Sequence, residues 1–272
     1  MRIRNVVAAA ALATLAALPV VAHAGDPVNV LILKEHGVGS AASAQEYVDK
    51  LMGHVSRLNG WSDSAGKYQT SRKLAKDWVK SANPHYGFLS LGAFLDLRSS
   101  QKLEVLGSAE VVGGGGRQYF IVSAGETGLA GCKGKSLGTD HGDDVRFIDK
   151  VVGKADFDLA DFQVVDTKRP VKTIKAAASG EVACALIDDA QKASMTKSGG
   201  ENLKVVWSSA ELPPMVVVAF PSAPADERKA FQSNLGKVCS GDGAASCKEV
   251  GLASLSSASE KAYAGVIGDY DK

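Results

Sequence analysis

The chain has 272 residues, with 31 Lys and Arg against 30 Asp and Glu, and 45% of its residues are hydrophobic. These values are ordinary for a globular protein and exclude a wholly disordered or collagen-like chain. The balanced charge also argues against a protein that binds nucleic acid through its net charge, so we expect no nucleic-acid partner.

The N-terminus has the pattern of a secretory signal peptide. Two arginines precede an apolar run over Val6–Val21, and Ala22-His23-Ala24 is a small-x-small cleavage site. The apolar run is short for a membrane span. No cysteine follows the cleavage site, so a bacterial lipid anchor is not indicated. The sequence therefore predicts a signal peptide over residues 1–24 and a soluble, periplasmic product.

Blocks of apolar and polar residues predict strands that alternate with helices. In chain order these elements are strand 28–33, helix 43–59, helix 71–81, strand 86–90, helical turn 93–99, strand 103–106, strand 118–123, strand 135–138, helix 140–152, strand 162–165, helix 171–179, strand 182–187, helix 190–197, strand 203–207, strand 215–220, helix 225–238 and helical segment 260–266. Such alternation favours the α/β class with mainly parallel sheets.

The glycines and histidines do not form a cofactor site. Gly113–Gly116 is followed neither by Lys-Ser/Thr nor by a helix, as a phosphate-binding loop would be, and predicts a flexible loop. The histidines at positions 36, 54, 85 and 141 are scattered, without the spacing of metal ligands. We therefore expect neither a metal nor another cofactor.

Four cysteines remain after cleavage of the signal peptide. An even number in an exported chain predicts two disulfides. Cys239 and Cys247 enclose a short segment that reads as a flexible loop and that a bridge could close, which leaves Cys132 to pair with Cys184. A metal site is the alternative, but no two of the four have Cys-x-x-Cys spacing.

Residues 164–217 carry the most characteristic pattern of the chain. A strand, a helix, a stop at Gly180 and a second strand ending in Asp188-Asp189 precede the stretch Trp207-Ser-Ser-Ala-Glu-Leu-Pro-Pro214. This order resembles the second half of a type II periplasmic solute-binding protein, most of all the phosphonate/phosphite group with its sulfonate-binding and transferrin-like relatives. Upstream, Tyr86–Ala93 resembles the strand and turn that line the cleft in that family, and Gly131–Gly138 resembles the entry to its second domain.

The resemblance implies two α/β lobes joined by two crossover strands. Lobe 1 would comprise residues 26–118 and 213–272, and lobe 2 residues 119–212. Ligands of such folds bind beyond the carboxyl ends of strands and beside helix N-termini, and hinge closure buries them. The resemblance therefore implies an exported, non-catalytic, monomeric protein that captures a small polar ligand, with phosphonate as one candidate, for an ABC permease or a membrane sensor.

Two other functions remain open at this point. A solitary sensor or a scavenger of the same fold would share the features above. An exported enzyme on this fold is less favoured, because the sequence has no Gly-x-Ser-x-Gly motif and no Cys/His pairing typical of nucleophilic catalysis.

The first two strand-to-helix junctions offer three candidate ligand contacts. Lys34 could pair with an anion, and the free N–H groups near Ser43 could bind one. Ser90 ends a strand where the family resemblance implies ligand contacts. The ordinary alternatives are a solvated lysine, a helix cap at Ser43 with Glu46, and a Ser90 hydroxyl bonded to its own backbone.

The third junction offers Thr139, Asp140 and His141, where phosphonate binders have Ser/Thr-rich helix starts. Here Asp143 and Asp144 add carboxylates that would compete with an anionic ligand for the same helix end. Asp140 could instead simply be the N-cap of the following helix.

The fourth junction offers Thr167 and Lys168, with Asp188 at the end of the next strand. The family resemblance implies that a polar residue and an acid at these places face an amine or hydroxyl of the ligand. The alternative for Asp188 is a cap on the helix that follows it.

Overall fold

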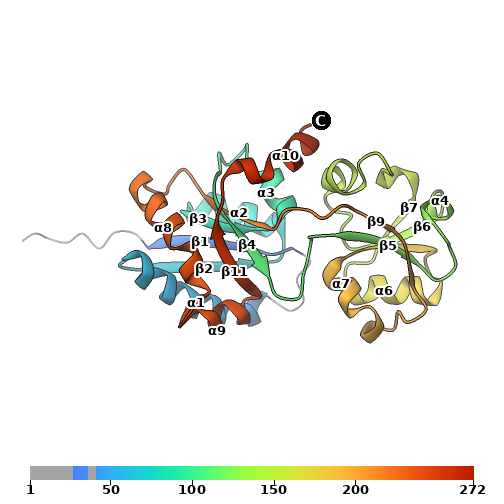
Figure 1. The fold of residues 1–272 in the computed structure, drawn as a ribbon, viewed down its shortest axis with the longest axis horizontal. Coiled ribbons are helices and arrows are strands. Elements are labelled where there is room, and N and C mark those ends of the chain that lie inside the picture. Colours follow the sequence, from blue (N-terminus) through green and yellow to red (C-terminus); the bar gives the residue numbers. More distant parts are fainter. Residues whose placement is uncertain (1–26, 36–40) are drawn as a thin grey trace, which may run out of the picture.

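The computed structural model describes residues 27–35 and 41–272 and has two lobes, each built on one β-sheet (Figure 1). We call the six-stranded sheet and its helices lobe 1, and the five-stranded sheet and its helices lobe 2. The strand orders are β11-β4-β10-β3-β1-β2 and β7-β6-β8-β5-β9. The expected signal peptide lies outside the described residues.

Lobe 1 is a sheet covered by helices on both faces. Its strands are β1 (Val28–Leu33), β2 (Ser64–Gln69), β3 (Tyr86–Leu89), β4 (Glu104–Val111), β10 (Met215–Ala219) and β11 (Leu252–Ser257); its helices are α1 (Ala41–Asn59), α2 (Arg72–Ala82), α3 (Leu91–Leu97), α8 (Ala225–Val238), α9 (Gly243–Glu249) and α10 (Ala264–Tyr270). Because successive side chains of a strand point to opposite faces, Val30 and Ile32 join the core under α1, α8 and α9. Leu31 and Leu33 join the core under α2 and α3.

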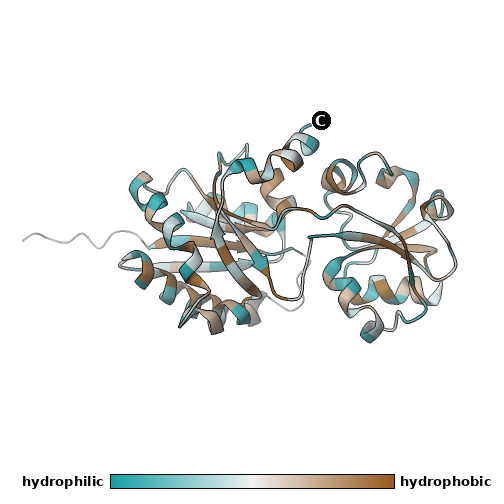
Figure 2. Cartoon of the chain, viewed as in Figure 1, coloured by the Kyte–Doolittle hydropathy of each residue, from teal (hydrophilic) through white to brown (hydrophobic). Residues whose placement is uncertain are grey.

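Lobe 2 repeats this arrangement on a smaller scale. Its strands are β5 (Tyr119–Ser123), β6 (Ser136–Thr139), β7 (Gln163–Asp166), β8 (Cys184–Asp188) and β9 (Lys204–Ser208); its helices are α4 (Leu129–Cys132), α5 (Val145–Phe147), α6 (Pro170–Ser179) and α7 (Asp189–Ser194), and the π-helix η1 (Ile148–Gly153) continues α5. Phe120 and Val122 pack under α6, whereas Tyr119 and Ile121 pack with Phe147 of the opposite layer. The brown strands at the centre of each lobe in Figure 2 are these buried sheets.

Both sheets are mixed, whereas the sequence favoured mainly parallel ones. In lobe 1, β1 is parallel to β2 and β3, but β10 is antiparallel to β3 and β4. In lobe 2, β6 is parallel to β7 and β8, but β5 is antiparallel to β8 and β9. β5 and β10 are the strands by which the chain enters a sheet after crossing from the other lobe, which accounts for their reversed direction.

Some predicted elements differ from the structure in place or extent. The helix expected over 140–152 begins at Val145, because Asp144 and not Asp140 is its N-cap, accepting a hydrogen bond from Phe147 N at 3.0 Å. α9 occupies part of the segment that was expected to be a flexible loop between Cys239 and Cys247. β2, α4 and β11 have no predicted counterpart.

Both expected disulfides are present. Cys132 at the end of α4 is bonded to Cys184 at the start of β8, and both residues are fully buried in lobe 2. Cys239 at the end of α8 is bonded to Cys247 in α9. In its described part, the chain has no helix with the length and hydropathy that a membrane span requires.

Gly107 lies in β4 at a point where a side chain has no room. A Cβ atom there would lie 2.4 Å from Leu235 Cδ1 and 2.5 Å from the backbone oxygen of Ser256 in the adjacent strand. We expect Gly107→Ala to lower the free energy of unfolding by about 1–3 kcal/mol, as overpacked substitutions do, in urea denaturation. Gly125→Ala is the control, because its Cβ would meet nothing within 4 Å; equal effects of the two changes would contradict the prediction.

Candidate functional site

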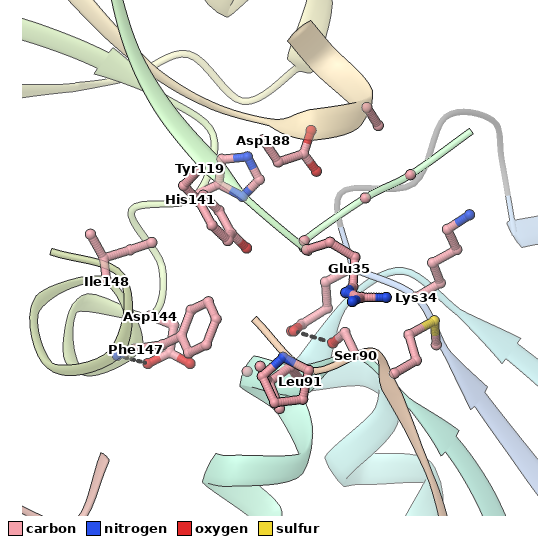
Figure 3. Close-up of a pocket in the computed structure, with 18 of the residues that line it drawn as sticks. Lys34, Glu35, Ser90, Leu91, Tyr119, His141, Asp144, Phe147, Ile148 and Asp188 are labelled. Carbon is pink, nitrogen blue, oxygen red and sulfur yellow. Dashed lines mark hydrogen bonds between the residues drawn. The ribbon is translucent and has the colours of Figure 1, made fainter. Parts of the chain in front are cut away.

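A cavity of about 300 Å³ lies between the two lobes (Figure 3). Lobe 1 lines it with the residues that follow β1 and β3 and with the start of α2. Lobe 2 lines it with the start of β5, the end of β8, the loop after β6, and α5. The cavity therefore lies beyond the carboxyl ends of β1, β3, β6 and β8, which is where open α/β sheets bind ligands.

Lys34 directly follows β1 and lines the lobe 1 side of this cavity. Its ammonium has no hydrogen bond or ion pair with the residues that the structure describes. Burial lowers the pKa of Lys34, and the charge of Asp188 across the cavity partly opposes this effect. Lys34 is therefore a partly desolvated cation that could pair with an acceptor or anion of a ligand.

Asp188 ends β8 on the opposite side and is 5% exposed. Its Oδ1 accepts a hydrogen bond from Gln191 N at 2.8 Å, so it caps α7, as the alternative reading held. Its Oδ2 has no hydrogen-bond donor among the described residues. Burial raises the pKa of Asp188, while the nearby His141 opposes the shift. This oxygen can therefore accept a hydrogen bond from a donor group of a ligand in the cavity.

Tyr119, at the start of β5, points its hydroxyl into the cavity (Figure 3). This hydroxyl also has no hydrogen-bond partner within the described part of the chain. The ring is fixed by edge contacts with His141 and Phe147, with centroids 5.3 and 5.9 Å apart. Burial raises the pKa of Tyr119 well above its usual value, so the group stays protonated and can donate to a ligand.

A buried hydrogen-bond network supports the lobe 2 wall. His141 lines the cavity and its Nε2 lies 2.8 Å from Gln191 Oε1. Gln191 Nε2 donates to Asp140 Oδ1 at 3.0 Å, and the Thr173 hydroxyl donates to the same oxygen at 3.0 Å. Asp140 thus lies behind His141 and helps to orient it.

Arg72, the first residue of α2, is the central cation of the cavity, but carboxylates surround it. Its Nε and Nη2 donate to the two oxygens of Glu35 at 2.8 and 2.7 Å, and its Nη1 donates to Asp144 Oδ2 at 2.5 Å. Ser90 Oγ donates to Glu35 at 2.8 Å. Although burial opposes its charge, Glu35 and Asp144 raise the pKa of Arg72 above its usual value. Two carboxylates, one from each lobe, therefore accept hydrogen bonds from this guanidinium.

The Gly113–Gly116 segment, expected to be a flexible loop, lines the cavity and has a defined backbone. All four glycines have positive φ, at 77, 81, 131 and 76°, which side chains rarely allow. Asp189 accepts hydrogen bonds from Gly115 N at 3.0 Å and from Arg117 N at 3.1 Å. A carboxylate of lobe 2 thus holds the segment that crosses between the lobes.

The cavity brings together four of the nine expected ligand contacts. Lys34, Ser90, His141 and Asp188 line it. Thr139 is buried behind the wall and donates to Leu186 O at 3.1 Å. Asp140 lies in the network described above.

The remaining expected contacts lie elsewhere. Thr167 is buried against Thr173. The Lys168 side chain is 78% exposed and pairs with Asp166. Both follow β7, which is an edge strand of its sheet, so its end lies away from the cavity. α1 begins at Ala41, so Ser43 lies inside the helix and is not its N-cap; its side chain lies outside the part that the structure describes.

The lining residues that were not predicted as ligand contacts include four of the polar groups described above: Glu35, Arg72, Tyr119 and Asp144. Glu35 could have been found from its place beside Lys34, immediately after a buried strand. Asp144 belongs to the acidic cluster that the sequence showed, but its partner was not apparent. The sequence around Tyr119 and Arg72 does not indicate a site residue. Tyr119 begins a strand of lobe 2, and Arg72 begins a helix of lobe 1.

A protein-family model described as "ABC transporter, phosphonate, periplasmic substrate-binding protein" matches residues 147–263. The resemblance that the sequence indicated is thereby confirmed. The proteins of this family are non-catalytic and bind solutes. A search of curated proteins finds no match.

Solved structures share the two-lobed type II fold. The binding protein component of an ABC phosphonate transporter from Pseudomonas aeruginosa aligns with a TM-score of 0.65 and 12% identity, over 88% of this chain and 84% of that one. PhnD1 from Prochlorococcus marinus in complex with methylphosphonate aligns with 0.65 and 11%, over 89% and 96%. The aliphatic sulphonate binding protein SsuA from Escherichia coli aligns with 0.54 and 13%, over 90% and 78%. The predicted α/β type II fold is confirmed.

Proposed function

From the resemblance of residues 147–263 to the periplasmic substrate-binding proteins of phosphonate ABC transporters, we propose that this protein is exported, captures one small polar solute between its lobes and delivers it to a membrane permease. The observation that carries the proposal is the cavity itself. It lies between the lobes, and the Lys34 ammonium and Asp188 Oδ2, which have no hydrogen-bond partner among the described residues, line it from opposite sides. Its volume of about 300 Å³ suits a small molecule.

Three polar groups of the cavity, each with an atom that lacks a hydrogen-bond partner within the described residues, define what the solute must offer. Lys34 on lobe 1 requires an acceptor, which an acidic group of the solute supplies best. Asp188 on lobe 2 requires a donor such as an amine or hydroxyl, and Tyr119 can donate or accept. A small acid that also carries a donor satisfies all three. The methylphosphonate in the Prochlorococcus relative supports the size and the acidic character of such a solute.

A second part of the proposal concerns movement. Residues of both lobes line the cavity, so a solute that enters and leaves requires the lobes to separate, as in hinged binding proteins. The segments between β4 and β5 and between β9 and β10 cross between the lobes. These two crossovers are the proposed hinge, with lobe boundaries near residues 118 and 213.

A thermal-shift and calorimetry screen of residues 25–272 tests the proposal. The panel holds phosphate, phosphite, alkyl- and aminoalkylphosphonates, sulfonates, amino acids, polyamines and divalent metals. A solute at 100 times its Kd should stabilise the protein by about 2.7 kcal/mol. We expect one class of small acids to bind with one-to-one stoichiometry and without turnover.

Two substitutions then test the contacts. Lys34→Met and Asp188→Asn should each weaken binding of the identified solute by about 10- to 100-fold, because each removes a charged hydrogen-bond partner. Asn is also a good N-cap, so Asp188→Asn preserves the start of α7. Lys168→Met and Asp166→Asn are matched controls, because this pair is exposed and does not line the cavity. Unchanged affinity in both cavity variants would contradict the proposal.

A further inference from the structure

Besides the two crossovers, lobe 2 contacts lobe 1 at the start of α5. The first contact joins Asp144 of lobe 2 to Arg72 of lobe 1, with 2.5 Å between Oδ2 and Nη1. The pair is well shielded, since the side chains of Asp144 and Arg72 are 10% and 15% exposed. Arg72 is fixed on its own lobe by two hydrogen bonds to Glu35, so it is already positioned to receive Asp144.

The second contact lies two residues further along and involves α10, which belongs to lobe 1 and lies on the side that faces lobe 2 (Figure 1). Arg146 Nε donates to Tyr270 O at 2.7 Å, and its guanidinium lies 5.0 Å from the centroid of the Tyr270 ring. Lys154 at the end of η1 adds an ion pair with Asp269 at 2.9 Å.

Apolar packing joins these polar contacts. One cluster of buried side chains continues from Phe147 and Ile148 of lobe 2 to Val266 and Tyr270 of α10. Separating the lobes here would expose this apolar surface to water, which is unfavourable. The contact is therefore a packed interface with three polar contacts, at Asp144, Arg146 and Lys154.

We propose that Asp144 and Arg146 latch lobe 2 onto lobe 1 before any ligand enters. The latch consists of these two residues and their partners Arg72 and Tyr270. Because it uses no ligand atom, it holds the cavity in a preformed shape. A solute that enters during a transient separation of the lobes then binds between lobes that close again through their own contacts, so less of its interaction energy is spent on closure. Asp144 and Arg146 are thus positioning residues for binding.

Two lobe 1 residues provide matched controls. Asp96 is a third carboxylate near Arg72, at 3.7 Å from Nη1, but it lies in α3 of the same lobe. Arg98 contacts the C-terminal segment as Arg146 does, through Asp271, but also from lobe 1. Asp144 and Arg146 therefore each contact the other lobe, whereas Asp96 and Arg98 make similar contacts within their own lobe.

The test is small-angle X-ray scattering of the ligand-free chain, freed of bound solute by unfolding, dialysis and refolding. Asp144→Ser keeps an N-capping hydroxyl that is too short to reach Arg72. We expect Asp144→Ser/Arg146→Ala to have a larger radius of gyration than the unsubstituted chain. Asp96→Ser/Arg98→Ala should leave that radius unchanged.

An unchanged radius in the cross-lobe variant would overturn the latch, and so would an equal increase in both variants. If the cross-lobe variant loses its native circular dichroism, Asp144→Asn/Arg146→Gln is compared with Asp96→Asn/Arg98→Gln on the same criterion. The inference goes beyond the proposed function, and no ligand is used. Its failure is therefore distinguishable from a failure to find a solute.

Discussion

Loss of the Cys132–Cys184 disulfide is expected to lower the free energy of unfolding by about 4 kcal/mol, against about 2.5 kcal/mol for Cys239–Cys247. The difference follows from the length of chain that each bond closes, since the sequence separations are 52 and 8 residues. A longer closed loop removes more conformational entropy from the unfolded chain. The first bond also joins α4 to the central strand β8 within the buried layer of lobe 2.

The measurement is equilibrium unfolding of two double variants, Cys132→Ala/Cys184→Ala and Cys239→Ala/Cys247→Ala. Alanine avoids placing a hydroxyl in the fully buried site of Cys132 and Cys184. Because Cys132 and Cys184 both lie in lobe 2, the larger loss should appear in the unfolding transition of that lobe. A loss for the eight-residue bond that equals or exceeds the other would refute the ranking.

The central strands of both lobes were predictable because a strand that is buried on both faces has an apolar run in its own sequence. β10 is a continuous apolar run whose residues are all buried, and in β1 only Asn29 interrupts the apolar run. β2 was missed for the opposite reason. It is the edge strand of its sheet, its sequence is SAGKYQ, and most of its residues are partly exposed. An edge strand can pair on one side without an apolar run, so periodicity does not reveal it.

Residues of the site were predictable only at the carboxyl ends of strands, where α/β sheets bind ligands. Lys34, Ser90 and Asp188 lie at or directly after strand ends, and these strands are central to their sheets. Lys168 also follows a strand, but β7 is at the edge, and the order of strands is not evident from one sequence. Arg72 lies in the cavity because one lobe packs against the other, and the sequence around residue 72 does not indicate this packing.

Arg72→Met is expected to lower the free energy of unfolding by about 3–5 kcal/mol near neutral pH, which is the cost of removing one partner from a buried ionic cluster. The side chains of Glu35 and Asp144 are 5% and 10% exposed, so each would retain a largely desolvated charge. Lys76→Met is the control, because its pair with Asp96 is more exposed, and its loss should cost less than about 1 kcal/mol.

The pH dependence of this deficit in the free energy of unfolding, relative to the unsubstituted chain, identifies its cause. Burial raises the pKa of Asp144 above 3.8, and Arg72 is the main opposing influence, so the pKa should rise further in the variant. A carboxyl with a raised pKa in the folded state binds its proton more tightly there than in the unfolded chain. The deficit should therefore be complete above that raised pKa and shrink as the pH falls through it towards 3.8.

Urea denaturation of both proteins at about pH 7.5 and about pH 4.5 measures the deficit under the two conditions. Methionine replaces most of the aliphatic stem of Arg72, so lost packing should contribute little and should not depend on pH. A deficit that shrinks on acidification would show that the lost stability is due to the charged carboxylates left without Arg72. A deficit equal at both pH values would assign it to packing, and Arg72 would then not act as the shared counter-ion of Glu35 and Asp144.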